Sequence, residues 1–287
     1  MNTDTFEFRV GRFRCLALLD GTFRYPPELF FSNLPREQYE PRLGSGQPVE
    51  TIEVPYICLY VDTGRHRMLV DTGAAGFGPT TGRLPGLLRQ AGIDRSDIDI
   101  VVLSHGHPDH IGGNLDDSGR LAFPAARHVM MRQEWEYWDS GPSLDELPAA
   151  DWLKQLVRAT AWRNLPPIRP QLDLITGDGP IAPGVSALAT PGHTPGHMAL
   201  QIESDGERLL FLADTVLHPL DIEYPDAVAV FDHSPVHMVA TRQRVLAGAE
   251  AGGTLVMASH LPFPALGRIA SSGTGWRWSS LAEGALA

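Results

Sequence analysis

Cysteine is scarce in this 287-residue chain, which has only Cys15 and Cys58. Each lies in a strand-like apolar run, RCLALL or PYICLYV, so we expect two buried free thiols rather than a disulfide. Neither cysteine has the spacing of a zinc-thiolate site. A metal bound by this chain would therefore need ligands other than sulfur.

Long apolar runs and an excess of positive charge are also missing. No run of apolar residues approaches 18 residues, and the start, MNTDTFEFRVGRFRC, has no apolar stretch behind basic residues. Basic residues number 23 against 34 acidic ones, a formal net charge of -11, which disfavours nucleic acid and anionic membrane surfaces as partners. We expect a soluble, cytoplasmic protein.

Internal repeats, low-complexity segments and linkers are absent as well, because glycine and proline are scattered as turn residues. The chain is 43% hydrophobic, which is enough for a large core. One domain spanning residues 1–287 is therefore expected.

Strand-like runs and single helical segments share the chain. Apolar patterns predict strands at 6–10, 13–21, 54–64, 66–73, 98–104, 185–192, 197–204, 208–215 and 254–260. Helices are predicted at 80–93 and 234–252, and a helical region holds Trp135, Trp138, Trp152 and Trp162. Strand groups that alternate with single helices, without strict βαβ repetition, favour an α/β (α+β) fold of two sheets packed face to face with helices outside.

Histidines and aspartates gather in four loops that each follow a predicted strand, where binding side chains are often placed. The loops are HGHPDH, TPGHTPGH, FLADT and VMASH, and the residues are His105, His107, Asp109, His110, His193, Asp214 and His260. Imidazole and carboxylate ligands without thiolate suit zinc, and also manganese, iron or cobalt.

The number of ligands is right for two ions. If Asp214 bridges, one ion has His105, His107 and His193, and the other has Asp109, His110 and His260. Two ions about 3.5–4 Å apart would lower the pKa of a shared water toward roughly 7 and supply hydroxide as a nucleophile. Their remaining positive charge would stabilise an oxyanion. Asp214 and Asp109 are the catalytic candidates, with Asp109 or a water handling the proton.

The same motifs resemble those of a known family. HGHPDH, PGHTPGH, LADT and ASHLPFP resemble the metallo-β-lactamase superfamily, and VDTGAAGFGPTTGRL with SHLPFPALGRI is similar to its methyl parathion hydrolase branch and to quorum-quenching lactonases. The resemblance runs from about Leu18 to Trp278. It implies a four-layer αββα sandwich that binds two divalent ions, most often zinc. It also implies the seven ligands above, with Asp214 bridging the ions, and a homodimer.

Substrate-pocket and supporting residues are predicted around this site. The resemblance places Phe77 and Trp138 as aromatic pocket walls, with Trp152 as a further candidate, and His218 follows Asp214 closely enough to overhang the pocket. With no dedicated Lys or Arg in view, a small, neutral, partly apolar substrate is favoured.

Two further residues are expected to support the ligands rather than bind metal. Asp71 ends a strand near the site and is expected to hold the metal loop by hydrogen bonds. His197 begins a strand just after His193 and is expected to have a supporting or structural role.

The predicted function is a dinuclear metal-dependent hydrolase of lactones or aryl esters, with phosphotriesters such as methyl parathion as a side activity. A β-lactamase of the same fold normally lacks the bridging aspartate. A glyoxalase II-like thioesterase needs a helical domain, and only 27 residues follow His260. A non-catalytic binding module stabilised by metal is the alternative from another class, although structural zinc sites are closed and often contain cysteine.

Overall fold

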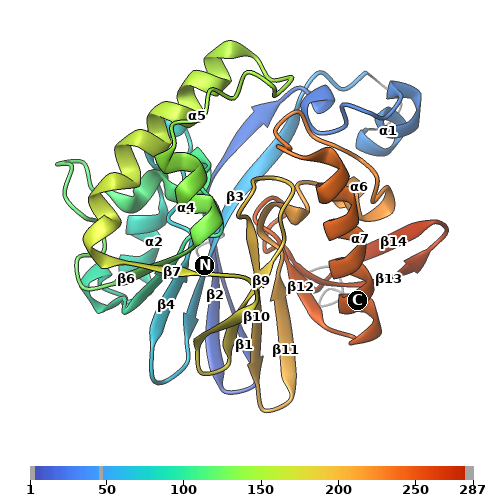
Figure 1. Cartoon of the computed structure of the whole chain (residues 1–287). Helices are drawn as coiled ribbons and strands as arrows, with labels where there is room; N and C mark the ends of the chain where they lie inside the picture. Colours follow the sequence, from blue (N-terminus) through green and yellow to red (C-terminus); the bar gives the residue numbers. More distant parts are fainter. Residues whose placement is uncertain (1–3, 45–47, 282–287) are drawn as a thin grey trace.

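Two β-sheets pack face to face in the computed structural model, which describes residues 4–44 and 48–281 (Figure 1). Each sheet has seven strands, and helices cover the outer face of each sheet. The predicted sandwich of two sheets between helices is therefore confirmed. Among the described residues, no helix is both long and apolar enough to cross a bilayer.

The first sheet holds the amino-terminal strands in sequence order. Its strands are β1 (Thr5–Val10), β2 (Phe13–Tyr25), β3 (Ile52–Asp62), β4 (Arg67–Val70), β5 (Ile100–Val102), β6 (Arg127–Met131) and β7 (Leu172–Ile175). Strands β1 to β4 pair antiparallel, whereas β4 to β7 pair parallel.

The second sheet is built from the carboxy-terminal half. Its strands are β8 (Gly179–Ala182), β9 (Val185–Ala189), β10 (Met198–Ser204), β11 (Glu207–Phe211), β12 (Leu255–Met257), β13 (Leu266–Ser272) and β14 (Gly275–Ser280). Its one parallel pair is β11 with β12. The other pairs are antiparallel.

The helices divide between the two outer faces (Figure 1). They are α1 (Arg36–Leu43), α2 (Leu84–Gln90), α3 (Pro108–Ile111), α4 (Arg132–Asp139), α5 (Asp151–Asn164), α6 (Pro219–Glu223) and α7 (Pro235–Ala251). Short 3-10 turns lie at Pro27–Leu29, Ala75–Phe77, Arg95–Asp97, Gly112–Asn114, Pro166–Gln171 and Ala213–Thr215. Helix α2 starts later than predicted because buried Asp20 accepts the backbone N–H groups of Gly82 and Leu84 ahead of the first turn.

Alternation along the strands separates the core into layers. On β3, Ile57 and Leu59 face the core between the sheets, whereas Cys58 and Tyr60 face the core under helices α2, α4 and α5. Cys15 lies in the core between the sheets, on the opposite face from Cys58. Both cysteines are buried and free, as predicted.

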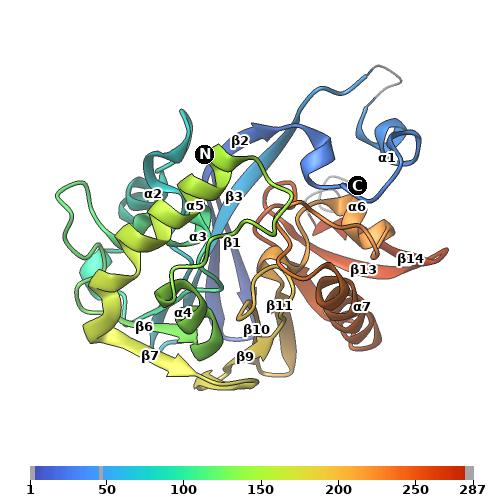
Figure 2. The same cartoon turned by 45° about the horizontal axis from the view of Figure 1, so that its top comes forward.

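The strand ends that carry the predicted motifs meet at one edge of the sandwich. The β1–β2, β3–β4 and β10–β11 turns lie at the bottom of Figure 1, so β4, β5, β11 and β12 all end near the top. Figure 2 brings this edge forward, with α3 close to it. The parallel pairs matter here because parallel neighbours end at the same edge.

Candidate metal centre

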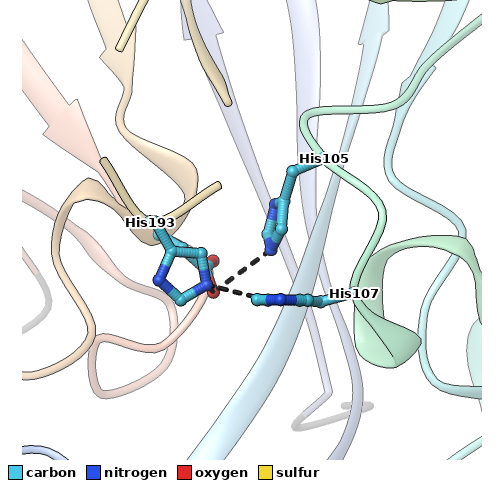
Figure 3. Close-up of side chains that lie close together, drawn as sticks. His105, His107 and His193 are labelled. Carbon is cyan, nitrogen blue, oxygen red and sulfur yellow. Dashed lines mark hydrogen bonds and ion pairs between the residues drawn. The ribbon is translucent and has the colours of Figure 1, made fainter. Parts of the chain in front are cut away.

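Three histidines converge on Asp214 in the first of two groups. His105 and His107 follow β5, His193 follows β9, and their imidazoles point toward one another (Figure 3). One ligand atom from each of these four residues lies within 4.8 Å of the other three. His107 Nδ1 is 2.9 Å from His193 Nε2, and His193 Nε2 is 3.3 Å from Asp214 Oδ2.

The second group joins Asp109, His110 and His260, whose ligand atoms also lie within 4.8 Å of one another. Asp109 and His110 lie on α3, and His260 follows β12. Asp109 Oδ2 is 3.4 Å from Nε2 of both histidines. Asp214 reaches this group too, because its Oδ1 is 3.2 Å from His110 Nε2 and its Oδ2 is 3.2 Å from His260 Nε2. Asp214 therefore lies between the two groups.

The seven side chains fit two divalent ions. In the described part of the chain, His105 Nε2, His110 Nε2 and Asp214 Oδ1 are buried with no hydrogen-bond partner. Buried polar atoms nearly always make hydrogen bonds, so three ligand atoms at one point that make none indicate a bound species. Nitrogen and carboxylate donors without sulfur are a set that zinc accepts.

Asp71 and Ser104 orient His110. The Asp71 carboxylate accepts hydrogen bonds from His110 Nδ1 at 2.8 Å and from the backbone N–H and hydroxyl of Ser104, each at 2.8 Å. The backbone of Asp71 has a positive φ of 62°, which a non-glycine residue adopts only when its surroundings hold it. Because Nδ1 is occupied, the free Nε2 of His110 turns toward the metal centre.

Two more of the Nε2-presenting histidines are fixed in the same way. His193 Nδ1 donates to Asp232 Oδ1 at 2.9 Å, and His260 Nδ1 donates to the carbonyl of Pro55 at 2.8 Å. The sequence analysis missed Asp232. In the sequence, Asp232 is marked only by the histidine beside it in the FDHSP turn. This turn has no fixed spacing from the TPGH motif that contains His193.

His197 supports Asp214 and has no nitrogen left for an ion. Its Nδ1 donates to the carbonyl of Thr190 at 3.1 Å, and its Nε2 accepts the backbone N–H of Asp214 at 3.1 Å. Burial lowers the pKa of His197 to about 3, so the ring stays neutral and can accept that bond.

Carboxylates around His193 favour its protonated form in the absence of metal. Burial lowers the pKa of His193, but Asp214 and Asp232 outweigh burial and raise this pKa to about 9. An ion that binds Nε2 must displace a proton, so metal affinity falls as the pH falls.

Glu134 joins the two loops that carry most of the histidines. The Glu134 side chain is fully buried on α4 and accepts four hydrogen bonds. Oε1 takes the backbone N–H of Gly106 at 2.8 Å and Nε1 of Trp138 at 2.7 Å. Oε2 takes the Thr194 hydroxyl at 2.7 Å and the backbone N–H of Gly196 at 2.9 Å. The sequence analysis missed Glu134 because three of its four partners lie 28 to 62 residues away.

An apolar cavity opens onto the metal-ligand groups. Its lining includes His107, Asp109, His193, Asp214 and His260. Aromatic walls come from Tyr25, Phe30, Tyr56, Phe77 and Phe231, and aliphatic walls from Val54, Leu144, Leu147, Leu153, Val157 and Leu217. Phe77 thus lies where the sequence analysis placed it.

Three predicted pocket residues lie elsewhere, and those predictions are corrected. Trp138 is 3% exposed and packs against the Gly106 backbone, because its indole N–H is bound by Glu134. Trp152 is 57% exposed on α5, one position before the cavity-lining Leu153. His218 caps α6, where its Nδ1 accepts the backbone N–H of Leu220.

The expectation of a cavity without a cation is also corrected. Lys154, the only lysine in the chain, lines the cavity from α5. Its Nζ lies 3.4 Å from the carbonyl oxygen of Asp145. The sequence could not show this, because helical spacing alone does not reveal what α5 covers.

A family model for the metallo-β-lactamase superfamily matches residues 54–260, and the chain belongs to this superfamily. This range contains all seven metal-centre residues. The resemblance drawn from the motifs is therefore confirmed.

Individual relatives narrow the comparison. An N-acyl homoserine lactonase of Bacillus sp. is 29% identical over 178 residues, which are 55% of this chain and 62% of that protein. The lactonase AttM of Rhizobium radiobacter is 29% identical over 180 residues, 61% of this chain and 62% of that protein. The chain thus matches less than two thirds of the length of these relatives.

Solved structures match over nearly the whole chain. AidC, a dizinc quorum-quenching lactonase in complex with its product, has a TM-score of 0.88 at 26% identity and covers 96% of this chain and 97% of its own. The hydrolase AbOPH of the β-lactamase superfamily has a TM-score of 0.86 at 26% identity and covers 98% of each chain.

Proposed function

We propose that the chain is a dinuclear metal-dependent hydrolase that opens small, partly apolar lactones. The observation that carries this proposal is the position of Asp214, which lies between two ligand groups at the end of an apolar cavity. Further support comes from the lactonase names of the relatives and of the similar structure AidC.

We assign each group of ligands to one ion, with zinc as the first candidate. One ion would be held by His105, His107 and His193, and the other by Asp109, His110 and His260. Asp214 would contact both ions. When bound, such a pair supplies an activated water and polarises the ester carbonyl.

The chain's own residues supply the rest of the reaction. Asp109 lines the cavity with its side chain 18% exposed, which supports a role for its carboxylate in taking the proton of the attacking water and returning it to the leaving oxygen. The apolar walls bind the non-reacting part of the ester and exclude water. Aryl esters and phosphotriesters, methyl parathion among them, are proposed as side substrates.

A substrate panel at matched metal loading tests the proposal. It contains an acyl homoserine lactone, dihydrocoumarin, methyl parathion, a β-lactam and a glutathione thioester. Turnover of either lactone supports the proposal. Turnover of the β-lactam or the thioester alone would instead assign one of the other superfamily activities, and no turnover of any compound would favour a metal-stabilised binding module.

Asp214→Ala tests the bridging role, with the exposed Asp117→Ala as the control. We expect Asp214→Ala to lose lactone turnover and to bind fewer than two ions by elemental analysis, while its far-UV circular dichroism stays that of a folded protein. Full activity in Asp214→Ala would refute the bridge.

A further inference from the structure

Two tyrosine hydroxyls meet in the wall of the cavity that opens onto the metal centre. Tyr25 ends β2 and Tyr56 lies on β3, and their Oη atoms are 2.5 Å apart. They are not register partners, since Tyr25 lies opposite Ile52 and Tyr56 lies opposite Gly21. The two side chains therefore reach along one face of the sheet to meet, and Gly21 has no side chain beside Tyr56.

The pair is close to the metal-ligand residues. The rings of Tyr56 and His260 are in edge contact with centroids 5.6 Å apart, and Pro55, next to Tyr56, accepts the His260 Nδ1–H. The ordinary pKa of a tyrosine hydroxyl is about 10, well above neutral pH. Both hydroxyls therefore keep their protons at neutral pH.

Counting protons leaves one donor without an acceptor. Two neutral hydroxyls carry two protons, and the bond between Tyr25 and Tyr56 uses one. Within residues 4–44 and 48–281, neither hydroxyl has another hydrogen-bond partner. Buried donors rarely remain unpaired, so the second proton is available to a molecule in the cavity.

We propose that the Tyr25–Tyr56 pair is a catalytic hydrogen-bond donor, which gives its free O–H to an oxygen of the scissile ester group. This inference rests on the proposed lactone hydrolysis. Negative charge builds on ester oxygens as the ring opens, and a neutral donor placed there stabilises the transition state. The tyrosine that donates to its partner also polarises the partner's O–H, which strengthens the outer hydrogen bond.

The proposal differs in its consequences from a purely structural role of the pair. If one hydroxyl is the outer donor, removing it removes the hydrogen bond to the ester completely. Removing the inner hydroxyl as well then adds little. If the pair only holds β2 against β3, each Tyr→Phe change weakens the fold, and activity follows stability.

The experiment compares Tyr25→Phe, Tyr56→Phe and the double variant, with Tyr60→Phe as the matched control. Tyr60 is buried on the same face of β3 but belongs to the core under the helices, away from the cavity. We expect the double variant to lose about 10- to 100-fold in kcat/KM for the lactone, mainly in kcat. One single variant should lose nearly as much as the double variant. Tyr60→Phe should retain wild-type kinetics, and metal content should be unchanged throughout.

A binding readout separates this inference from the proposed function. A γ-lactam with the same acyl chain as the lactone is not readily hydrolysed and serves as the probe. Its binding should perturb the near-ultraviolet tyrosine absorption of the wild type and of Tyr60→Phe, and leave that of the double variant unchanged.

Three results would overturn the inference while leaving the proposed function intact. The first is wild-type turnover in the double variant. The second is a loss of kcat/KM in the double variant equal to the product of the losses in the two single variants, with unfolding midpoints that fall in parallel. The third is lactam binding without any tyrosine signal. A wild-type protein that binds the lactam with a tyrosine signal but opens no lactone would refute the proposed function instead.

Discussion

Glu134→Gln is expected to weaken the hydrogen bonding that joins the two histidine loops, while it keeps the shape of the side chain. The carboxylate accepts four hydrogen bonds, two on each oxygen. An amide replaces one oxygen with an NH2 group, which cannot accept. The least costly arrangement places this NH2 beside Thr194, whose hydroxyl can rotate and accept, so the Gly196 N–H alone loses its partner.

The magnitude follows from that count. One buried donor without an acceptor costs about 1–3 kcal/mol. The opposite orientation of the amide leaves both the Gly106 N–H and the Trp138 indole N–H unpaired and costs roughly twice as much. We therefore expect Glu134→Gln to lower the free energy of unfolding of the metal-free protein by about 1–3 kcal/mol. Because Gly196 lies three residues after His193 in the same loop, metal affinity should fall about 10- to 100-fold.

The assays are urea unfolding of the metal-free protein and metal competition against a chelator. Glu136→Gln is the matched control, because Glu136 is exposed on the same helix two residues away. It should change neither quantity beyond about 0.5 kcal/mol. If Glu134→Gln matched this control in both assays, the carboxylate would not be what holds the loops together.

Two further predictions concern single cationic or titrating side chains. Lys154→Met should lower kcat/KM about tenfold for an ester with an acidic tail, because the charge-assisted hydrogen bond from Lys154 to that tail is lost. The kcat/KM for the neutral analogue should stay unchanged. Equal effects on both esters, measured side by side, would contradict a role for the charge. Burial lowers the pKa of His128 to about 4, below its unfolded value of about 6.5, so between these pH values the unfolded chain binds a proton that the folded chain excludes. The free energy of unfolding should therefore fall by up to about 3 kcal/mol as the pH drops through this window. In urea titrations of the metal-free protein, His128→Leu should remove this pH dependence of the free energy of unfolding. An unchanged pH dependence would rule out His128 as its source.

Local patterns were sufficient to predict most of the fold. Alternating apolar residues predicted β3 and β4 and the turn between them, and helical spacing predicted α2 and α7. The pattern of single helices among strand groups predicted the two packed sheets. These features depend on residues close in sequence, so sequence periodicity records them.

The residues that line the cavity were predicted less well than the residues that gather at the candidate metal centre. The histidines and aspartates have chemical identities that stand out, and their loops follow strands that end at one edge. Trp138 has no such marker. An i, i+4 relation to Glu134 turns its indole toward the metal loop from behind, and the sequence gives no sign of which side of that loop the helix covers.

The sequence alone determined the set of donors, because seven nitrogen and carboxylate groups follow strands in four loops without a thiolate pair, and this set supports the proposed two-metal site. Only the tertiary structure decided which groups surround those donors. Asp232, Glu134 and the Tyr25–Tyr56 pair reach the centre through contacts between residues far apart in the chain. Such contacts follow from how the sheets and helices pack, and no local spacing encodes them.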